Sequence, residues 1–233
     1  MNRPAQHLPI VLAALLLGVP ACDSTEQSPL PPAPTGGRFG EDGRTDAAVH
    51  DHDAPDSSGQ PVEDRRSVAC ADPDWTPGPC VEGVGEHRDN QGQAHIAVDQ
   101  PIAYAFDPPS SGDHRGVWAR WGAYEDLPPQ RFLHNLEHGG AALLHHPCAP
   151  AVTVQALRDV ADARDDDAGG PFRWVLTPYP DLPQAIAVVT WEWTYTADCV
   201  RPDEIAEFLD RHYRMAPEDI ASDGGYAEGW LGR

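Results

Sequence analysis

The run AIAVVTWEWTYT, residues 185–196, is the best strand candidate in the chain. β-branched and aromatic side chains dominate it, and these residue types favour strands. Residues 172–177, FRWVLT, have the same character, and residues 141–145, AALLH, predict a third strand. We therefore expect these three segments to contribute to the sheet that organises the domain.

Two segments on either side of these strands have the apolar periodicity of amphipathic helices. They are residues 152–164 and residues 202–213, the second of which begins with Pro202, a residue that suits the first turn of a helix. Residues 131–138 are ambiguous between a helical turn and a loop. The order strand–helix–strand–strand–helix after Gly140 predicts a single compact α+β domain, with a small antiparallel or mixed sheet backed by two helices.

Shorter elements are expected before and after this core. Residues 95–98 and 102–106 are predicted to be short strands around a turn, and residues 118–124 an extended edge. Residues 108–113 contain two prolines and a glycine and are predicted to be a loop. The acidic, glycine-rich tail, residues 217–233, is expected to be irregular.

The N-terminus has the features of a bacterial lipoprotein signal. Residues 8–19 form an apolar run that is too short to span a bilayer. The run ends in Val-Pro-Ala-Cys at residues 19–22, which resembles the lipobox in which the cysteine is diacylated. We expect residues 1–21 to be removed and Cys22 to anchor the protein to the membrane, facing the periplasm or the cell exterior. Ordinary secretory cleavage after Ala21 is the alternative.

A tether is predicted between the anchor and the domain. Residues 22–67 are acidic and rich in proline, with few large apolar side chains, so they cannot bury enough surface to offset the entropy of ordering. We expect them to be disordered and to hold residues 68–216 away from the membrane. His50 and His52 lie in the tether and could bind a metal weakly, but a solvated, charged segment is the favoured interpretation.

The charge of the chain limits its partners. The net charge is −21, and all sixteen basic residues are arginine. No basic groove for a phosphate backbone is visible, which argues against nucleic acid as a partner. The lack of lysine excludes Schiff-base chemistry and a phosphate-binding P-loop.

Four cysteines remain in the predicted domain, Cys70, Cys80, Cys148 and Cys199. An even number in an exported protein indicates two disulfides. We favour Cys70–Cys80, which closes a short proline-rich loop, and Cys148–Cys199, because each of these cysteines follows a predicted strand. Metal ligation by Cys70 or Cys80 is the alternative, since thiolates are good ligands.

A series of short motifs gives the chain its most specific signal. In order they are Tyr104, PPSSGDH at residues 108–114, WGAY at 121–124, HNLEHG at 134–139, TPYP at 177–180, and Thr190-Trp191. This series resembles DUF3105, a bacterial family of exported or membrane-anchored proteins without an established activity, over roughly residues 95–208. Ser110 stands where the family usually has threonine, and Glu192 follows the tryptophan where the family often has glycine.

The histidines within these motifs are the candidate metal ligands. His134 and His138 are four residues apart and would share one face of a helix, the spacing that metal-binding helices use. Glu137 is a further ligand or an acceptor that fixes a histidine tautomer, and His114 follows a rigid turn. His95 is added as a fourth imidazole because the family often has a His-Val pair there. Imidazole-rich sites suit copper(II) or zinc, so the sequence favours a copper- or zinc-binding module.

Two other interpretations stay open. In the first, the histidines and Glu137 form a hydrogen-bond network that joins the loops. In the second, the protein is a hydrolase, with Ser110 or Ser111 as nucleophile and His114 or His138 as base, or with a metal and Glu137 as base. The chain lacks the Gly-x-Ser-x-Gly turn that presents a serine nucleophile, and a binding protein is favoured over an enzyme.

Overall fold

The computed structural model describes residues 68–180 and 182–233. The predicted signal peptide, the lipidation site at Cys22 and the tether at residues 22–67 lie outside the described residues. Within the described part of the chain, no helix has the length and apolar character needed to cross a bilayer.

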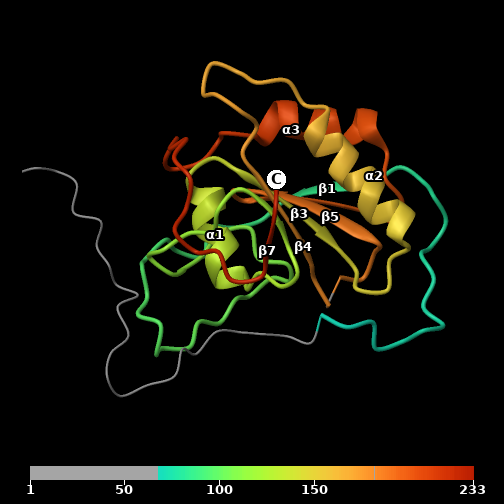
Figure 1. Cartoon of the computed structure of the whole chain (residues 1–233), viewed down its shortest axis with the longest axis horizontal. Helices are drawn as coiled ribbons and strands as arrows, with labels where there is room; N and C mark the ends of the chain where they lie inside the picture. The colour runs from blue at the N-terminus through green and yellow to red at the C-terminus, as the bar shows by residue number, and fades with distance from the viewer. Residues whose placement is uncertain (1–67, 181) are drawn as a thin grey trace, which may run out of the picture. The chain divides into compact units, whose positions relative to one another are not determined.

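The described residues form one mixed sheet of seven strands in the order β1-β6-β5-β3-β4-β2-β7 (Figure 1). Strands β2, β4 and β3 are parallel to one another, and the other neighbouring pairs are antiparallel. The strands are β1 (Val84–His87), β2 (Gly122–Tyr124), β3 (Ala141–His145), β4 (Trp174–Pro178), β5 (Ile186–Thr190), β6 (Trp193–Ala197) and β7 (Trp230–Gly232).

In the described part of the chain, three helices pack on this sheet: α1 (Pro129–Glu137), α2 (Ala151–Asp162) and α3 (Pro202–His212). Helices α2 and α3 cover one face and α1 covers the other (Figure 1). The α+β fold class is confirmed. Two helices were predicted and three are observed in the described residues, because the ambiguous segment at residues 131–138 lies mostly within α1.

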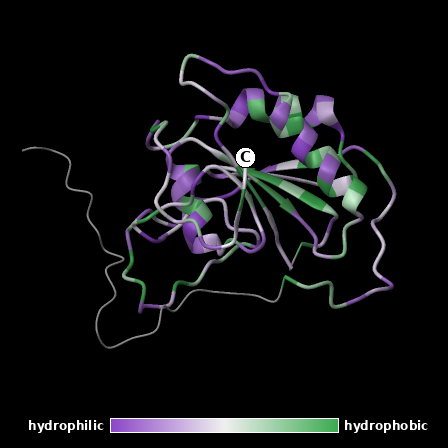
Figure 2. Ribbon diagram, viewed as in Figure 1, coloured by the Kyte–Doolittle hydropathy of each residue, from purple (hydrophilic) through white to green (hydrophobic). Residues whose placement is uncertain are grey.

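The pleat of the sheet divides the core into two layers, because successive side chains of a strand point to opposite faces. On β3, Leu143 packs in the layer that contains Leu157 of α2 and Phe208 of α3. The next residue, Leu144, packs in the layer that contains Leu133 of α1. Burial on both faces explains why the central strands are hydrophobic throughout, whereas the helices carry hydrophilic residues as well (Figure 2).

The prediction of one strand at residues 185–196 is wrong. Strands β5 and β6 are antiparallel and joined by a tight turn, with Thr190 paired with Trp193. Glu192 lies in this turn with φ at 62°. That backbone conformation favours glycine, the residue that the family often has there. The Glu192 side chain accepts a hydrogen bond of 2.7 Å from Asn90, a contact that glycine would lack.

Two further expectations are corrected. Residues 95–98 and 102–106 form no strand, and the first segment pairs with the chain only through an isolated bridge between His95 and His114. In this loop, carbonyls of residues 96, 97 and 100 accept hydrogen bonds from the side chain of Arg115 instead of from a neighbouring strand. The tail, residues 217–233, is not wholly irregular, since it ends in β7, which pairs with β2, and Trp230 packs against the core layer beneath α1.

The disulfides are Cys70–Cys148 and Cys80–Cys199. All four cysteines are bridged, as expected, but the favoured pairing of Cys70 with Cys80 and Cys148 with Cys199 is wrong. Cys148 follows β3 and Cys199 follows β6, and β5 lies between these two strands. Two strand spacings are about 10 Å, too far for a disulfide between the strand ends. The bridges instead tie the segment before β1 to each strand end, and they remove Cys70 and Cys80 as metal ligands.

Candidate metal centre

His95 and His114 lie on two loops that pair through their main chains. The amide of Ile96 donates to the carbonyl of His114 over 2.8 Å, and the amide of His114 donates to the carbonyl of Ala94 over 2.9 Å. The two imidazole rings are 5.1 Å apart as a result. The buried guanidinium of Arg115 donates to carbonyls of the loop that follows His95 and holds that loop in place.

Helix α1 supplies the next two side chains, and His138 follows at its C-terminal end. The Nε2 atoms of His134 and His138 are 3.1 Å apart, so the two imidazoles share one face, as the helical alternative predicted. The side chain of Asn135 fixes the neighbouring loop, since its amide group accepts from the nitrogen of Ala119 over 3.0 Å and donates to the Ala119 carbonyl over 2.8 Å.

Three imidazoles converge on the carboxylate of Glu137. Its Oε2 lies 3.0 Å from Nε2 of His114 and 4.0 Å from Nε2 of both His95 and His134. The ligand atoms of these four residues all lie within 4.8 Å of one another. The side chains of His114, His134 and Glu137 are at most 6% exposed, whereas that of His95 is 39% exposed, so the cluster opens to solvent on the His95 side.

Two of the imidazoles have their tautomers fixed by main-chain carbonyls. Nδ1 of His114 lies 2.8 Å from the carbonyl oxygen of Gly112, and Nδ1 of His134 lies 2.7 Å from that of Arg115. A carbonyl oxygen only accepts, so each Nδ1 carries the proton. When such a ring is neutral, its lone pair sits on Nε2, the atom that faces the cluster. This is the arrangement that orients histidines bound to metals.

The contact between His114 and Glu137 brings two electron-rich atoms close together. Nε2 of His114 is buried and makes no hydrogen bond, although Oε2 of Glu137 is 3.0 Å away. An imidazole lone pair and a carboxylate oxygen repel one another at this distance. A cation bound by both atoms, either a proton or a metal ion, removes the repulsion.

Burial favours the neutral forms of His134 and His138. It is the main cause that lowers the pKa of His134 to about 2, and the neighbouring His114 and His138 lower it further. Burial is also the main cause that lowers the pKa of His138 to about 4, against the opposing effect of Glu137. Neutral imidazole is the form that binds a metal ion.

His138 belongs to a second group of potential ligands. Its Nε2 lies 3.1 Å from Oε2 of Glu218, and these two residues form with Glu137 a separate group whose ligand atoms lie within 4.8 Å of one another. The five residues predicted from the sequence are thus divided between two groups that share Glu137. Glu218 was not predicted from the sequence, because it lies in the tail and belongs to no motif that would single it out.

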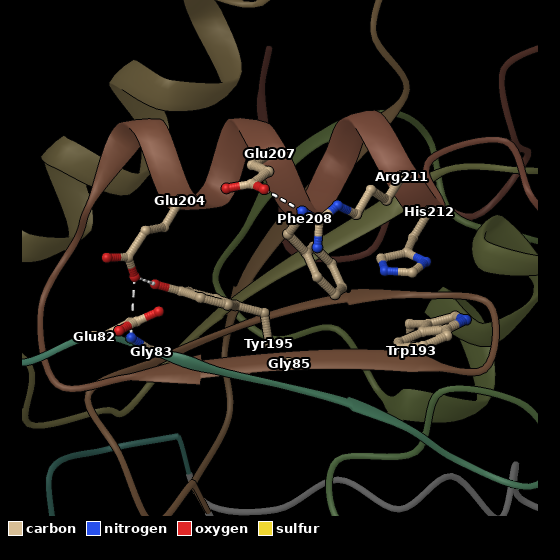
Figure 3. A pocket seen from close by; sticks show the side chains of 10 residues that line it. All are labelled: Glu82, Gly83, Gly85, Trp193, Tyr195, Glu204, Glu207, Phe208, Arg211 and His212. Atoms are coloured by element: carbon tan, nitrogen blue, oxygen red, sulfur yellow. Dashed lines mark hydrogen bonds and ion pairs between the residues drawn. The ribbon is translucent and has the colours of Figure 1, made fainter.

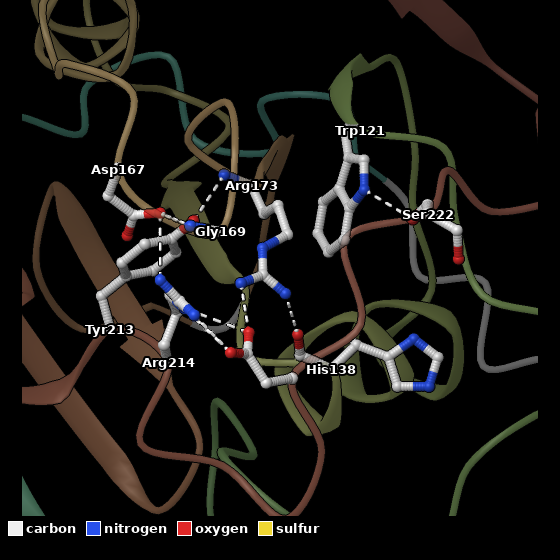
Figure 4. Close-up of polar contacts among 9 residues, drawn as sticks. Trp121, His138, Asp167, Gly169, Arg173, Tyr213, Arg214 and Ser222 are labelled. Atoms are coloured by element: carbon white, nitrogen blue, oxygen red, sulfur yellow. Dashed lines mark hydrogen bonds and ion pairs between the residues drawn. The ribbon is translucent and has the colours of Figure 1, made fainter.

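The tail is held against the end of α1 by the main chain and by two arginines. The amide of Glu218 donates to the carbonyl of Glu137 over 3.0 Å. The buried guanidinium of Arg173 donates to the carbonyl of His138 over 2.7 Å (Figure 4) and pairs with Asp219, which also binds Arg214. These contacts place the Glu218 carboxylate beside His138.

The serines of the hydrolase interpretation point elsewhere. Ser110 and Ser111 are fully buried, and the hydroxyl of Ser111 accepts from the amide of Gln91 over 3.1 Å. Among the contacts described for residues 68–180 and 182–233, neither hydroxyl bonds to a histidine. The geometry offers no support for serine as a nucleophile.

A groove of about 240 Å³ lies between α3 and β6 (Figure 3). It is a weaker candidate for a functional site than the histidine cluster. Several of its polar side chains already pair with one another or with the main chain. Glu204 accepts from the amide of Gly83 and from the hydroxyl of Tyr195, each over 3.0 Å, and Glu207 pairs with Arg211. None of the histidines near Glu137 lines this groove.

Fold and site define an α+β domain with a buried cluster of histidines around one carboxylate. A family profile described as a protein of unknown function, DUF3105, matches residues 95–225, and the chain belongs to this family. The match extends beyond the resemblance noted from the motifs, and it includes all the histidines of the cluster and Glu218. Comparisons with curated proteins and with solved structures gave no match.

Proposed function

We propose that this protein is a metal-binding module in which His95, His114, His134 and Glu137 hold one zinc or copper(II) ion. The carboxylate at the centre of three imidazoles is the observation that carries the proposal. Two of these imidazoles have Nδ1 bound to a carbonyl, which leaves Nε2 directed at the carboxylate. Such an arrangement is preset for a cation.

The distances from the imidazoles to the Glu137 carboxylate fit a single ion. Zinc binds imidazole nitrogen and carboxylate oxygen at about 2.0–2.2 Å, so two ligands of one ion are separated by at most roughly 4.4 Å. The three nitrogens lie 3.0 to 4.0 Å from Oε2 of Glu137. Three imidazoles with one carboxylate, and no thiolate or thioether, suit zinc or copper(II).

A hydrogen-bond network is the second candidate function. The contacts at 3.0 Å between His114 and Glu137 and at 3.1 Å between His134 and His138 favour it, because a proton on each would bridge the pair. In that case the histidines would only join α1 to the loops. A hydrolase is disfavoured, since the burial of His114, His134 and Glu137 keeps an organic substrate from the reactive atoms.

We place this module outside the cytoplasm, anchored to the membrane through lipid on Cys22. The lipobox-like sequence at residues 19–22 supports this placement. Two disulfides in a small domain support it independently, because such bridges persist in oxidising compartments. The net charge of −21 supports metal cations as partners and disfavours nucleic acid.

Calorimetric titration of the full-length chain, purified without a polyhistidine tag and stripped with chelator, tests the proposal. We expect Zn²⁺ or Cu²⁺ to bind tightly, and the double variant His114→Ala/His134→Ala to lose this binding. His145→Ala is the control, since His145 is a partly buried histidine that lies outside the cluster, on β3. Binding that is unchanged in the double variant would leave only the network.

A further inference from the structure

We propose that a second cation binds between Glu137, His138 and Glu218, and that the Glu137 carboxylate bridges it to the first. This inference rests on the proposed function and extends it from one ion to a pair. The ligand atoms of the three residues lie within 4.8 Å of one another, and Nε2 of His138 lies 3.1 Å from Oε2 of Glu218.

The arrangement of the two groups favours a pair of ions over one ion with many ligands. His138 is not among the residues grouped with His95 and His114, and Glu137 alone belongs to both groups. A carboxylate has two oxygens and can bind one ion through each. Carboxylate-bridged sites hold two ions about 3.5–4 Å apart.

Nε2 of His138 faces two hydrogen-bond acceptors, and one proton on this atom cannot satisfy both. It lies 3.1 Å from Nε2 of His134 and 3.1 Å from Oε2 of Glu218. Nε2 of His134 carries a lone pair, because the proton of this ring is held on Nδ1 by the Arg115 carbonyl. The second acceptor is a carboxylate oxygen. A single N–H group satisfies one of these acceptors, whereas one cation at each position engages all three atoms.

The second position differs from the first in exposure and in donor type. The side chain of Glu218 is 48% exposed, and that of His138 is 3% exposed. Two carboxylates and one imidazole form a harder donor set than three imidazoles and one carboxylate. An ion at this solvent-facing position would complete its coordination with water. We therefore expect it to bind more weakly than the first ion and to exchange faster.

Contacts of the tail segment hold Glu218 in position beside the end of α1. The amide of Glu218 bonds to the carbonyl of Glu137, and the next residue, Asp219, pairs with the buried Arg173. Arg173 in turn donates to the carbonyl of His138 (Figure 4). The main chain at Glu218 and the side chain of Asp219 are thus both held in place, and the Glu218 carboxylate lies beside His138.

Equilibrium dialysis against Zn²⁺ measures the number of ions. The background is the full-length, untagged chain with His50→Ala and His52→Ala, which removes the tether histidines. We expect two ions per chain, the second with an affinity at least tenfold lower. Glu218→Gln should lose only the weaker ion and leave the tighter affinity within threefold. Glu125→Gln, which removes another exposed carboxylate on β2's C-terminal side, should keep both ions.

The outcomes separate the two proposals. One ion in the background protein, or two ions retained by Glu218→Gln, overturns the second position and leaves the first intact. If no chain binds any ion, the proposed function itself fails. Electron paramagnetic resonance with two equivalents of Cu²⁺ adds geometry: a coupled signal that becomes isolated in Glu218→Gln is expected. An isolated signal in the background protein at two equivalents would overturn the shared bridge.

Discussion

Nδ1 of His134 donates to the main-chain carbonyl of Arg115 over 2.7 Å, and the guanidinium of the same arginine holds the loop after His95. One residue therefore orients an imidazole of α1 and also positions a loop that carries another. His114 directly precedes it in the chain. Arg115 contacts no ion in the proposed site, but it connects three of the proposed ligands.

Replacing Arg115 by lysine should weaken metal binding although no ligand is removed. Lysine lacks the planar fork that reaches several carbonyls at once, so the His95 loop should lose its anchor. We expect an affinity for Zn²⁺ about 10 to 100 times lower, the range seen when the groups that orient metal ligands are altered. Arg131→Lys is the control, since Arg131 is also buried but donates to the carbonyl of Val117. Equal effects of the two substitutions on affinity would contradict this role.

Metal binding should stabilise the wild-type protein and not the His134→Ala variant. A ligand that binds only the folded state at 100 times its dissociation constant adds about 2.7 kcal/mol to the free energy of unfolding. In the metal-free state, His134→Ala should cost about 1–3 kcal/mol, because the buried carbonyl of Arg115 loses its donor. Urea unfolding with chelator and with Zn²⁺ measures both quantities. An equal gain with Zn²⁺ in both proteins would assign the histidine a structural role alone.

The metal-free protein should lose stability as the pH falls below about 6.5. Burial lowers the pKa of His138 to about 4 in the folded state, below the value of about 6.5 expected in the unfolded chain. The unfolded state therefore binds more protons between these values, so stability rises with pH across this window. The contribution of His138 between pH 7 and pH 5 is about 2 kcal/mol. Chemical unfolding in chelator should show a smaller pH dependence for His138→Gln, and an undiminished dependence would argue against this assignment.

The disulfide pairing can be read directly from peptides of the unreduced protein. Proteolysis followed by mass spectrometry should find Cys70 linked to Cys148 and Cys80 linked to Cys199. Removing the second bridge by Cys80→Ser/Cys199→Ser should lower the free energy of unfolding by about 2–5 kcal/mol, because the bridge constrains the unfolded chain. A peptide that joins Cys70 to Cys80 would contradict the fold around β1.

Local patterns in the sequence predicted the parts of the fold that depend on local residues. The apolar runs at β3 and β4 and the helical periodicity of α2 and α3 agree with the structure within a few residues. The run at 185–196 failed because a tight turn can interrupt a strand without proline or glycine, here at Glu192. Disulfide pairing failed for a different reason: it depends on the order of the strands in the sheet, which the composition of each strand does not encode.

For the candidate site too, the sequence predicted what depends on neighbouring residues and not what depends on tertiary contacts. Helical spacing alone predicts that His134, Glu137 and His138 lie close together, and the structure places them at one end of α1. The motif order suggested His114 but gave no distance. Glu218 could not be found, because its place beside His138 depends on a tail whose path is set by tertiary contacts with Arg173 and with the main chain of Glu137.

Those tail contacts give the last prediction. Asp219 bonds to Arg214 and to the buried Arg173, and the hydrogen bonds from these arginines lower its pKa to about 2. Asp219→Asn should destabilise the protein by about 1–3 kcal/mol, because the buried guanidinium loses a charged acceptor. Asp210→Asn is the matched control: Asp210 pairs with Arg164 but is 70% exposed, and such surface pairs contribute less than about 1 kcal/mol.

The same substitution should act on the proposed second ion without touching its ligands. Once the pair with Arg173 is weakened, the tail segment is less firmly fixed and Glu218 spends less time beside His138. We expect the weaker Zn²⁺ site to lose affinity in Asp219→Asn while the tighter site is unchanged, and neither site to respond to Asp210→Asn. A loss of the tighter site instead would mean that Arg173, through the carbonyl of His138, supports the whole end of α1.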